Sequence, residues 1–148
     1  MCSSDLMYQR QSLPLVIGVS NAEKARFDAS GNFLIGTSTA SATLLTVNGP
    51  GSFKAPATKT ADYSQVATDS SLIFNGSGTI TLTLQNAASY PGRILYVKTI
   101  AAQAVNSASS NVVPIGSSTA GTAILTNTAG KWAMLQSDGT NWVIMAAG

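Results

Sequence analysis

The residues that most often do acid, base or nucleophilic chemistry are scarce in this sequence. The chain of 148 residues has no His, one Cys (Cys2), and six Asp and Glu residues in total. Without His there is neither a Ser-His or Cys-His nucleophile pair nor an imidazole base. The carboxylates are scattered beside turn residues and include no spaced pair suited to cleaving a glycosidic bond. We therefore predict that the protein is not an enzyme.

Two carboxylates and two stretches that contain Gly and Ser could in principle belong to a catalytic or phosphate-binding site. We expect Asp62 and Asp69 to stabilise turns, because Asp side chains in loops accept hydrogen bonds from nearby backbone amides. Residues 76–78 and 116–118 contain Gly and Ser, but neither stretch has the Lys and the following helix of a phosphate-binding loop. With no His and an isolated Cys, a metal site is not expected. The sequence predicts no cofactor.

Aromatic and polar residues gather in the C-terminal half of the chain, and they are the best candidates for contacts with another molecule. Aromatic rings flanked by amides and a carboxylate are typical of sugar and protein recognition. Those near the Asp-Gly turn are expected at an exposed hairpin tip. The alternative, that both Trp residues belong to the core or to a subunit interface, stays open. The candidate contact residues are Tyr90, Trp132, Asp138, Thr140, Asn141 and Trp142.

Low charge and the absence of a long apolar run exclude two classes of partner. Charged residues make up 9% of the chain and the net charge is +2, whereas a typical domain has about 25% charged residues. The three cationic and three acidic residues of 61–148 cancel. No cationic cluster is present to displace counterions, so we predict no nucleic-acid partner. The longest apolar run, residues 13–19, is far shorter than the roughly 20 residues of a membrane span, and no membrane insertion is expected.

The elements that position these residues are predicted to be strands. Residues 79–84 alternate Thr with Ile or Leu, which indicates a strand buried on one face. Residues 93–100 are apolar on both faces and are expected to be covered on both sides. The Asp138-Gly139 turn predicts a hairpin of 131–136 with 141–145. In that hairpin we expect Leu135 opposite Trp142 and Ala133 opposite Ile144, with Trp132, Met134, Val143 and Met145 on the other face.

The chain is expected to have two structured parts. Residues 1–6 differ in character and are left outside the fold as a leader. Residues 7–50 form an assembly or attachment segment of short strands at 15–19, 25–27, 33–35 and 44–47, with a turn at 28–32. Strands this short bury little by themselves, which favours association. Residues 51–60, with Gly and Pro, are predicted to be a linker, and residues 61–148 an antiparallel β-sandwich-like domain.

One internal similarity is present. Residues 35–40 (IGTSTA) and 115–120 (IGSSTA) share five of six identities at a spacing of 80. In a chain so rich in Ser, Thr and Ala, chance explains this similarity as well as a duplication does.

Two stretches carry a resemblance to a known class of proteins. Residues 25–37 (ARFDASGNFLIGT), closing with 45–49 (LTVNG), resemble a segment of structural appendage proteins of tailed bacteriophages, especially tail fibres. Residues 90–95 (YPGRIL) with 131–142 (KWAMLQSDGTNW) are similar to β-rich terminal domains of phage tail and fibre proteins. The resemblance implies a homotrimer whose N-terminal strands wind about a three-fold axis below a β-sandwich head. It implies no defined binding site.

The expected function is that of a non-enzymatic virion structural protein. It would be a homotrimeric, tail-fibre-like appendage on the tail or capsid surface, acting in host attachment or virion assembly. Its expected partners are its own copies, other virion proteins, and a host-surface glycan or protein. One alternative is a capsid decoration or cement protein. Another is a monomeric carbohydrate-binding module with Trp132 or Trp142 as its stacking platform.

Overall fold

The computed structural model describes residues 11–40 and 43–148, and it divides into two compact units between Ser52 and Phe53. The predicted leader, residues 1–6, lies outside the described residues. The all-β prediction is confirmed: among the described residues, the single helical element is the short 3-10 turn η1 (Ala87–Ser89). No helix in this part of the chain is long and apolar enough to cross a membrane.

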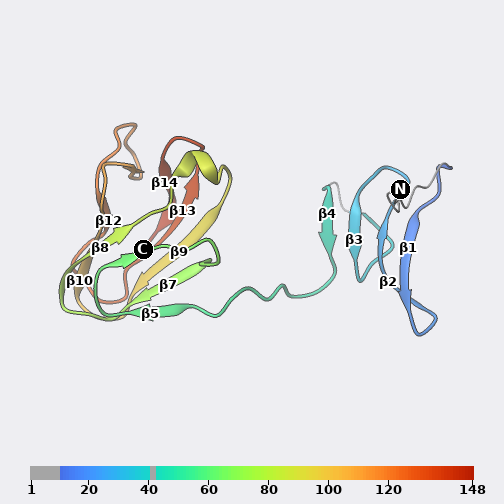
Figure 1. The fold of residues 1–148 in the computed structure, drawn as a ribbon, viewed down its shortest axis with the longest axis horizontal. Helices are drawn as coiled ribbons and strands as arrows, with labels where there is room; N and C mark the ends of the chain where they lie inside the picture. The colour runs from blue at the N-terminus through green and yellow to red at the C-terminus, as the bar shows by residue number, and fades with distance from the viewer. Residues whose placement is uncertain (1–10, 41–42) are drawn as a thin grey trace, which may run out of the picture. The chain divides into compact units, whose positions relative to one another are not determined.

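The N-terminal unit contains a four-stranded sheet in the order β1-β2-β3-β4 (Figure 1). The pairs β1/β2 and β2/β3 are antiparallel, whereas β3/β4 is parallel. All four predicted strands are present, although β2 begins three residues earlier than predicted and β4 one residue later. The bounds are β1 Leu15–Val19, β2 Ala22–Phe27, β3 Phe33–Ile35 and β4 Leu45–Val47.

The turn between β2 and β3 is held by one carboxylate. Asp28 Oδ1 accepts hydrogen bonds from the amides of Ser30 and Asn32, each at 2.9 Å, and Asp28 Oδ2 accepts one from Asn32 Nδ2. These bonds lower the pKa of Asp28, the side-chain amide of Asn32 contributing most. The turn predicted at 28–32 is therefore confirmed, and the chemistry of Asp and Asn that predicted it also holds it.

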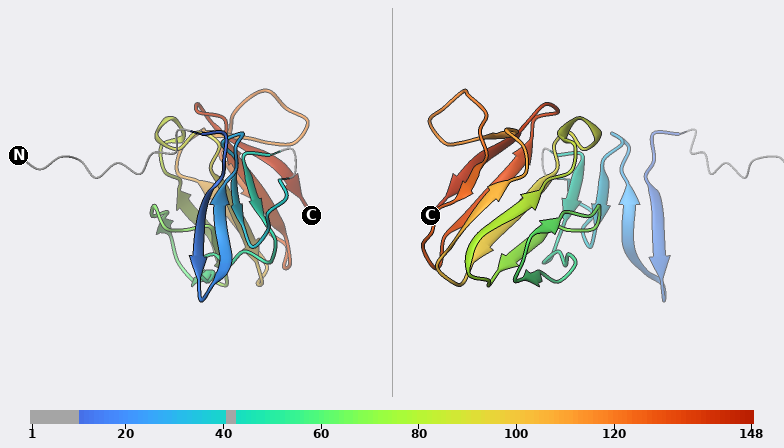
Figure 2. Two further views of the ribbon diagram at one scale, coloured as in Figure 1. Left: turned by 90° about the vertical axis from the view of Figure 1, so that its right-hand side faces the viewer. Right: turned by 60° about the vertical axis from the view of Figure 1, so that its left-hand side comes forward.

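The C-terminal unit is a sandwich of two sheets, visible in Figure 1 and, from other sides, in Figure 2. One sheet has the order β12-β10-β8-β6 and the other the order β11-β14-β13-β9-β7-β5. The strands are β5 Ala57–Lys59, β6 Tyr63–Ser64, β7 Ser71–Phe74, β8 Gly78–Thr83, β9 Ile94–Thr99, β10 Gln103–Ser107, β11 Val112–Val113, β12 Ala123–Leu125, β13 Trp132–Ser137 and β14 Trp142–Ala147.

From β5 to β10 the chain changes sheet after every strand, and this alternation corrects the antiparallel expectation. The chain reverses direction each time it crosses to the other sheet, so it runs in the same direction again when it returns. As a result β5, β7 and β9 run parallel in one sheet, and β6, β8 and β10 run parallel in the other. Antiparallel pairing occurs at β9/β13, β13/β14 and β10/β12. Successive turns stack, since the amide of Asn75 donates to Lys59 O at 2.8 Å and that of Ile100 to Phe74 O at 3.0 Å.

The core between the two sheets follows the predicted alternation. Ile80, Leu82 and Leu84 are buried as expected. On the β13–β14 hairpin, the side chains predicted to share one face are all buried: Ala133, Leu135, Trp142 and Ile144. The predicted pairing of residues across the two strands is wrong. Leu135 pairs with Ile144 and Ser137 with Trp142, because the tip has four residues between the strands and a bulge lies further along.

Two further expectations are wrong. The linker predicted at 51–60 contains β5, which pairs with β7, so the C-terminal unit begins earlier than residue 61. Residues 93–100 are covered on one side only: Leu95 and Val97 face the core, while Ile94 and Tyr96 are 41% and 51% exposed. Within a single chain, the second apolar face of this strand therefore stays about half exposed.

Candidate functional site

The predicted hairpin tip is an exposed loop held by Asp138. Its Oδ1 accepts hydrogen bonds from the amides of Thr140 at 2.7 Å and Asn141 at 2.6 Å. The amides of Asn141 and Thr140 lower the pKa of Asp138, so this carboxylate is ionised across the neutral range. The side chains of Asp138 and Thr140 are exposed. The tip thus presents a fixed charge and a hydroxyl to solvent.

The structure brings this tip beside the turn that contains Tyr90. The amide of Gly92 donates to Ser137 O at 2.8 Å, and Ser137 Oγ donates to Ala87 O at 2.9 Å. A Cβ built on Gly139 would lie 3.7 Å from Cβ of Pro91. Both loops lie at the same end of the six-stranded sheet in Figure 1. Four predicted contact residues therefore gather at one end: Tyr90, Asp138, Thr140 and Asn141.

Arg93 fixes the Tyr90 side of this end. Its guanidinium lies 4.9 Å from the centroid of the Tyr90 ring and donates to Gln85 Oε1 at 2.8 Å. It also donates to the carbonyl oxygens of Ala67 and Asp69, both at 2.7 Å. A guanidinium with several planar donors suits such a role. The guanidinium of Arg93 therefore makes its hydrogen bonds within the chain, and it covers one face of the half-buried Tyr90 ring.

The two Trp residues have different roles. Trp142 is fully buried, and its Nε1 donates to Gln85 O at 2.8 Å, so its prediction as an accessible contact is wrong and the core alternative holds. Trp132, at the opposite end of β13 from the tip, is 40% exposed. It borders a hollow of about 280 Å³ shared with Thr126 and Lys131. Trp132 is accessible, but it is not part of the cluster at the tip.

Each carboxylate in the described part of the chain accepts hydrogen bonds from the chain itself. Asp69 is buried and accepts from the amide of Val66 and the hydroxyl of Tyr63, each at 2.9 Å, with Lys54 Nζ 3.3 Å from its other oxygen. It stabilises a turn, as predicted. Asp62 instead accepts from a distant amide, that of Thr81 in β8, at 2.7 Å. In residues 11–40 and 43–148 no three metal-ligating side chains gather.

The N-terminal sheet has one face made only of apolar side chains. The pairing places Leu15, Phe27, Phe33 and Leu45 in one row, and Ile17, Ala25, Ile35 and Val47 in the next. The rings of Phe27 and Phe33 stack with centroids 4.7 Å apart. All eight side chains are exposed or half-buried. The neighbouring row on the opposite face is mixed and includes Arg26 and Thr46. We call the two apolar rows the N-terminal apolar face.

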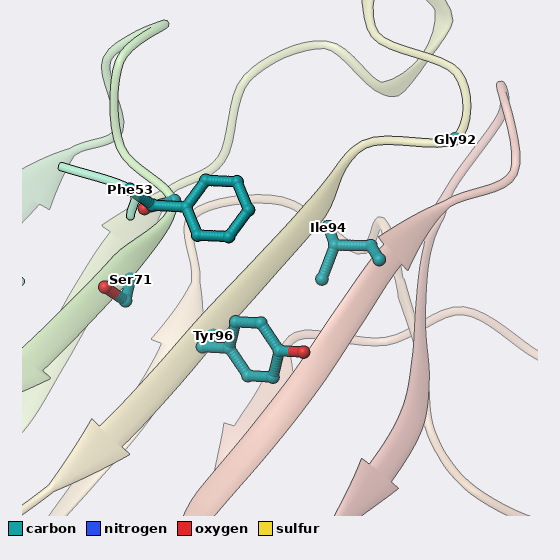
Figure 3. Close-up of a pocket in the computed structure, with 6 residues that line it drawn as sticks. Phe53, Ser71, Gly92, Ile94 and Tyr96 are labelled. Atoms are coloured by element: carbon teal, nitrogen blue, oxygen red, sulfur yellow. The ribbon is translucent and has the colours of Figure 1, made fainter. Parts of the chain in front are cut away.

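Sequence reasoning missed one further feature, a hollow of about 410 Å³ on the outer side of the six-stranded sheet. Figure 3 shows the ring of Phe53 and the side chains of Ile94 and Tyr96 around the same open space. Ser70, Ser71 and Gly92 complete its wall. The sequence signal lies in residues 93–100, where the outward positions 94 and 96 are Ile and Tyr and the next, 98, is Lys. The sequence does not predict the position of Phe53, because the Gly and Pro residues around it are typical of a linker.

Comparisons with protein-family models, curated proteins and solved structures give no match.

Proposed function

We propose that the protein is a non-enzymatic structural protein of a tailed-bacteriophage virion, a homotrimeric, tail-fibre-like appendage that acts in host attachment or virion assembly. The N-terminal unit assembles three copies, and the C-terminal sandwich is the outward head. The phage assignment is supported by the resemblance of residues 25–37, 45–49, 90–95 and 131–142 to appendage proteins. The placement on the virion follows from that resemblance.

The observation that carries the proposal is the N-terminal apolar face. Small sheets need a covered hydrophobic face to be stable in water. Full burial of a Val, Leu, Ile or Phe side chain is worth about 1.5–3 kcal/mol, so covering several half-exposed ones would contribute roughly 5 kcal/mol per chain. Leu34 is the one large apolar residue fully buried in the described part of this unit. Three such faces around one axis would cover one another.

The head supports attachment through its geometry. The end that carries Tyr90, Asp138, Thr140 and Asn141 is a pair of hydrogen-bonded loops on a sandwich, which is the usual location of recognition residues. Three copies on one axis bind a repetitive host surface with an avidity far above that of one head. Weak contacts by each head are then sufficient.

The first experiment is the solution mass of the full chain by light scattering after size exclusion. The proposal expects three times the chain mass of 15.1 kDa, and a mass equal to one chain would contradict it. Immunogold electron microscopy of virions then separates the two locations. Few copies on the tail support the appendage, whereas many copies on the head support the capsid decoration protein.

The exposed Trp132 supports a second candidate, a carbohydrate-binding module. An indole ring beside Thr126 and Lys131 offers a stacking surface with nearby polar groups. A glycan array with the wild-type chain and Trp132→Ala tests it. Binding that Trp132→Ala abolishes, in a protein with the mass of one chain, would favour this candidate over the trimeric appendage.

A further inference from the structure

The outer side of the six-stranded sheet is a second apolar surface, separate from the N-terminal apolar face. Strand pairing places Tyr96 beside Met134, and Ile94 beside Gln136 and Val143, on the side away from the core. Phe53, 82% exposed, stands over the same surface. Together with Ile73, Trp132 and Met145, these residues form what we call the outer face.

The two margins of the outer face differ in shape. On the β7 and β9 side is the hollow walled by Phe53, Ile94 and Tyr96. On the β14 side, Met145 is 53% exposed and has no cross-strand partner, because Leu135 pairs with Ile144 while Met134 pairs with Ala146. A bulge of this kind re-aims a side chain. One margin is therefore concave and aromatic, and the other carries a flexible thioether.

This shape difference matches what a cyclic assembly requires. In a three-fold ring, each contact joins one surface of a copy to a different surface of the next copy. Met fills irregular gaps and makes favourable contacts between its sulfur and aromatic rings. Met145 of one copy and the hollow of its neighbour are thus complementary in both shape and chemistry.

Charge and area also favour a second copy as the occupant. Lys98 is the one charged side chain among the outward positions of β7, β9, β13 and β14, so a highly charged partner has at most one group per copy to pair with, whereas a second apolar surface fits the remaining positions. A buried aromatic side chain covers about 150–250 Å². The exposed parts of Phe53, Tyr96 and Trp132 therefore amount to about 350 Å² per copy, near half of the roughly 800 Å² per partner in a standard interface.

The chain connection raises the local concentration of this surface. Five residues, 48–52, join β4 to Phe53, the first residue of the C-terminal unit. An extended chain of this length reaches about 20 Å. In a trimer assembled through the N-terminal units, three outer faces are therefore held within reach of one another at an effective concentration in the millimolar range.

We propose that the outer face of the six-stranded sheet is an interface between copies of this chain, with Met145 of one copy seated in the hollow formed by Phe53, Ile94 and Tyr96 of the next. This inference rests on the proposed trimer and adds to it a second contact, between the heads. The heads would then stand as one rigid cluster instead of three tethered domains.

The test is hydroxyl-radical labelling of the full chain, read by peptide mass spectrometry at Phe53, Tyr96 and Met145. The reference is the same protein diluted until light scattering gives a single chain. In the trimer we expect labelling at these residues to fall about five-fold, since side chains at the centre of an interface lose nearly all accessible surface. Ile115, 62% exposed in a loop outside the outer face, is the internal control and should label equally in both states.

A matched pair of variants locates the contact. Met145→Asp should restore labelling of Tyr96 to the reference level while the mass remains that of a trimer, and Ile115→Asp should leave Tyr96 protected. A trimer in which Tyr96 and Met145 label as in the single chain overturns this inference alone. Protection that persists in the diluted single chain means that the chain covers its own outer face, and it also overturns the inference. A wild-type protein that is monomeric at every concentration overturns both this inference and the proposed function.

Discussion

Thr37 and Ser117 lie 80 positions apart and make the same hydrogen bonds. Thr37 Oγ1 accepts from the amide of Thr39 at 3.1 Å, and Ser117 Oγ accepts from that of Thr119 at 3.0 Å. Each hydroxyl also lies 3.4 Å from the carbonyl oxygen of the same residue. The strands on either side pair differently, since β3 and β4 are neighbours in one sheet while β11 and β12 belong to different sheets. The shared sequence therefore encodes the turn locally.

Replacement of Gly116 tests whether the local sequence determines the conformation of this turn. Gly116 precedes the hydroxyl with a φ of +78°, which non-glycine residues adopt at a cost of about 1–2 kcal/mol. We expect Gly116→Ala to lower the free energy of unfolding by that amount. Gly121→Ala in the same loop is the control, because the new Cβ meets nothing within 4 Å and no left-handed φ is required. Denaturant unfolding of both variants measures the difference, and equal stabilities would contradict the prediction.

Gly76 tests the stacking of turns in the two sheets. Its amide donates to Gln103 Oε1, and a Cβ built on it would lie 2.5 Å from Thr60 O in the stacked turn. Because that neighbour is backbone, one of the turns must shift, at an overpacking cost of about 1–3 kcal/mol. Gly76→Ala should lower the thermal midpoint by several degrees in calorimetry. The exposed neighbour variant Ser77→Ala should leave it unchanged.

The fold was predictable where the signal is local. The N-terminal strands, the turn at Asp28 and the inward residues of β8 follow from alternation and turn chemistry. β10 was not predictable, because its inward side chains are Gln103, Val105 and Ser107 and its strand partner β8 lies across an intervening strand. Of these polar inward residues, Gln103 accepts a hydrogen bond at Oε1 from the amide of Gly76, in the turn between β7 and β8. Such non-local pairing leaves no periodic trace in the sequence.

The candidate site was predictable to a similar degree. The Asp-Gly signal located the tip, and the bonds that Asp138 accepts are those expected of an Asp in a turn. The role of Trp142 depended on which side of the hairpin faces the second sheet, and alternation alone does not decide that. The outer hollow needed Phe53 to return over β9, which is a tertiary arrangement that the Gly- and Pro-containing segment did not indicate.

Acid should weaken the C-terminal unit through Asp69. Burial raises the pKa of this carboxyl, but the bonds from the Val66 amide, the Tyr63 hydroxyl and Lys54 outweigh it and hold the pKa below its usual range. A pKa lowered on folding contributes stability at neutral pH, and this contribution disappears as the pH falls through the usual carboxyl range to the folded pKa. Denaturant unfolding at a series of acidic pH values should show this loss.

The variant Asp69→Asn identifies the group. It removes the charge from a buried, fully bonded site, so we expect a loss of about 1–3 kcal/mol at neutral pH. The difference from the wild type should shrink toward acidic pH, where the wild-type carboxyl is also neutral. An acid dependence that Asp69→Asn leaves unchanged would assign the effect to another group.

Replacing each Trp in turn should distinguish a residue that stabilises the core, Trp142, from one that lies at the surface, Trp132. Trp142→Phe leaves Gln85 O without its donor and reduces the volume of a buried side chain, so we expect it to lower the free energy of unfolding by about 1–3 kcal/mol. Trp132→Phe changes a half-exposed ring and should cost less than about 0.5 kcal/mol. Each variant retains one Trp, so its fluorescence reports on that residue alone. When both are measured as single chains, acrylamide should quench Trp142→Phe, which retains Trp132, more strongly than Trp132→Phe, which retains Trp142. Equal quenching would contradict the burial of Trp142.

Two adjacent residues on opposite sides of β1 test the N-terminal assembly. Ile17 lies on the N-terminal apolar face and Val16 on the other side, beside Arg26, and they are 45% and 46% exposed. In a single chain, an Asp at either position stays in contact with water and disturbs the fold equally little. In a trimer built on the apolar face, Asp at 17 would bury a charge without a partner, which costs several kcal/mol. Light scattering should therefore give the mass of one chain for Ile17→Asp and of three for Val16→Asp, whose charge can pair with Arg26 across the strands.

Circular dichroism that matches the wild type would show that Ile17→Asp dissociates without unfolding. If Val16→Asp dissociates and Ile17→Asp does not, the opposite face joins the copies.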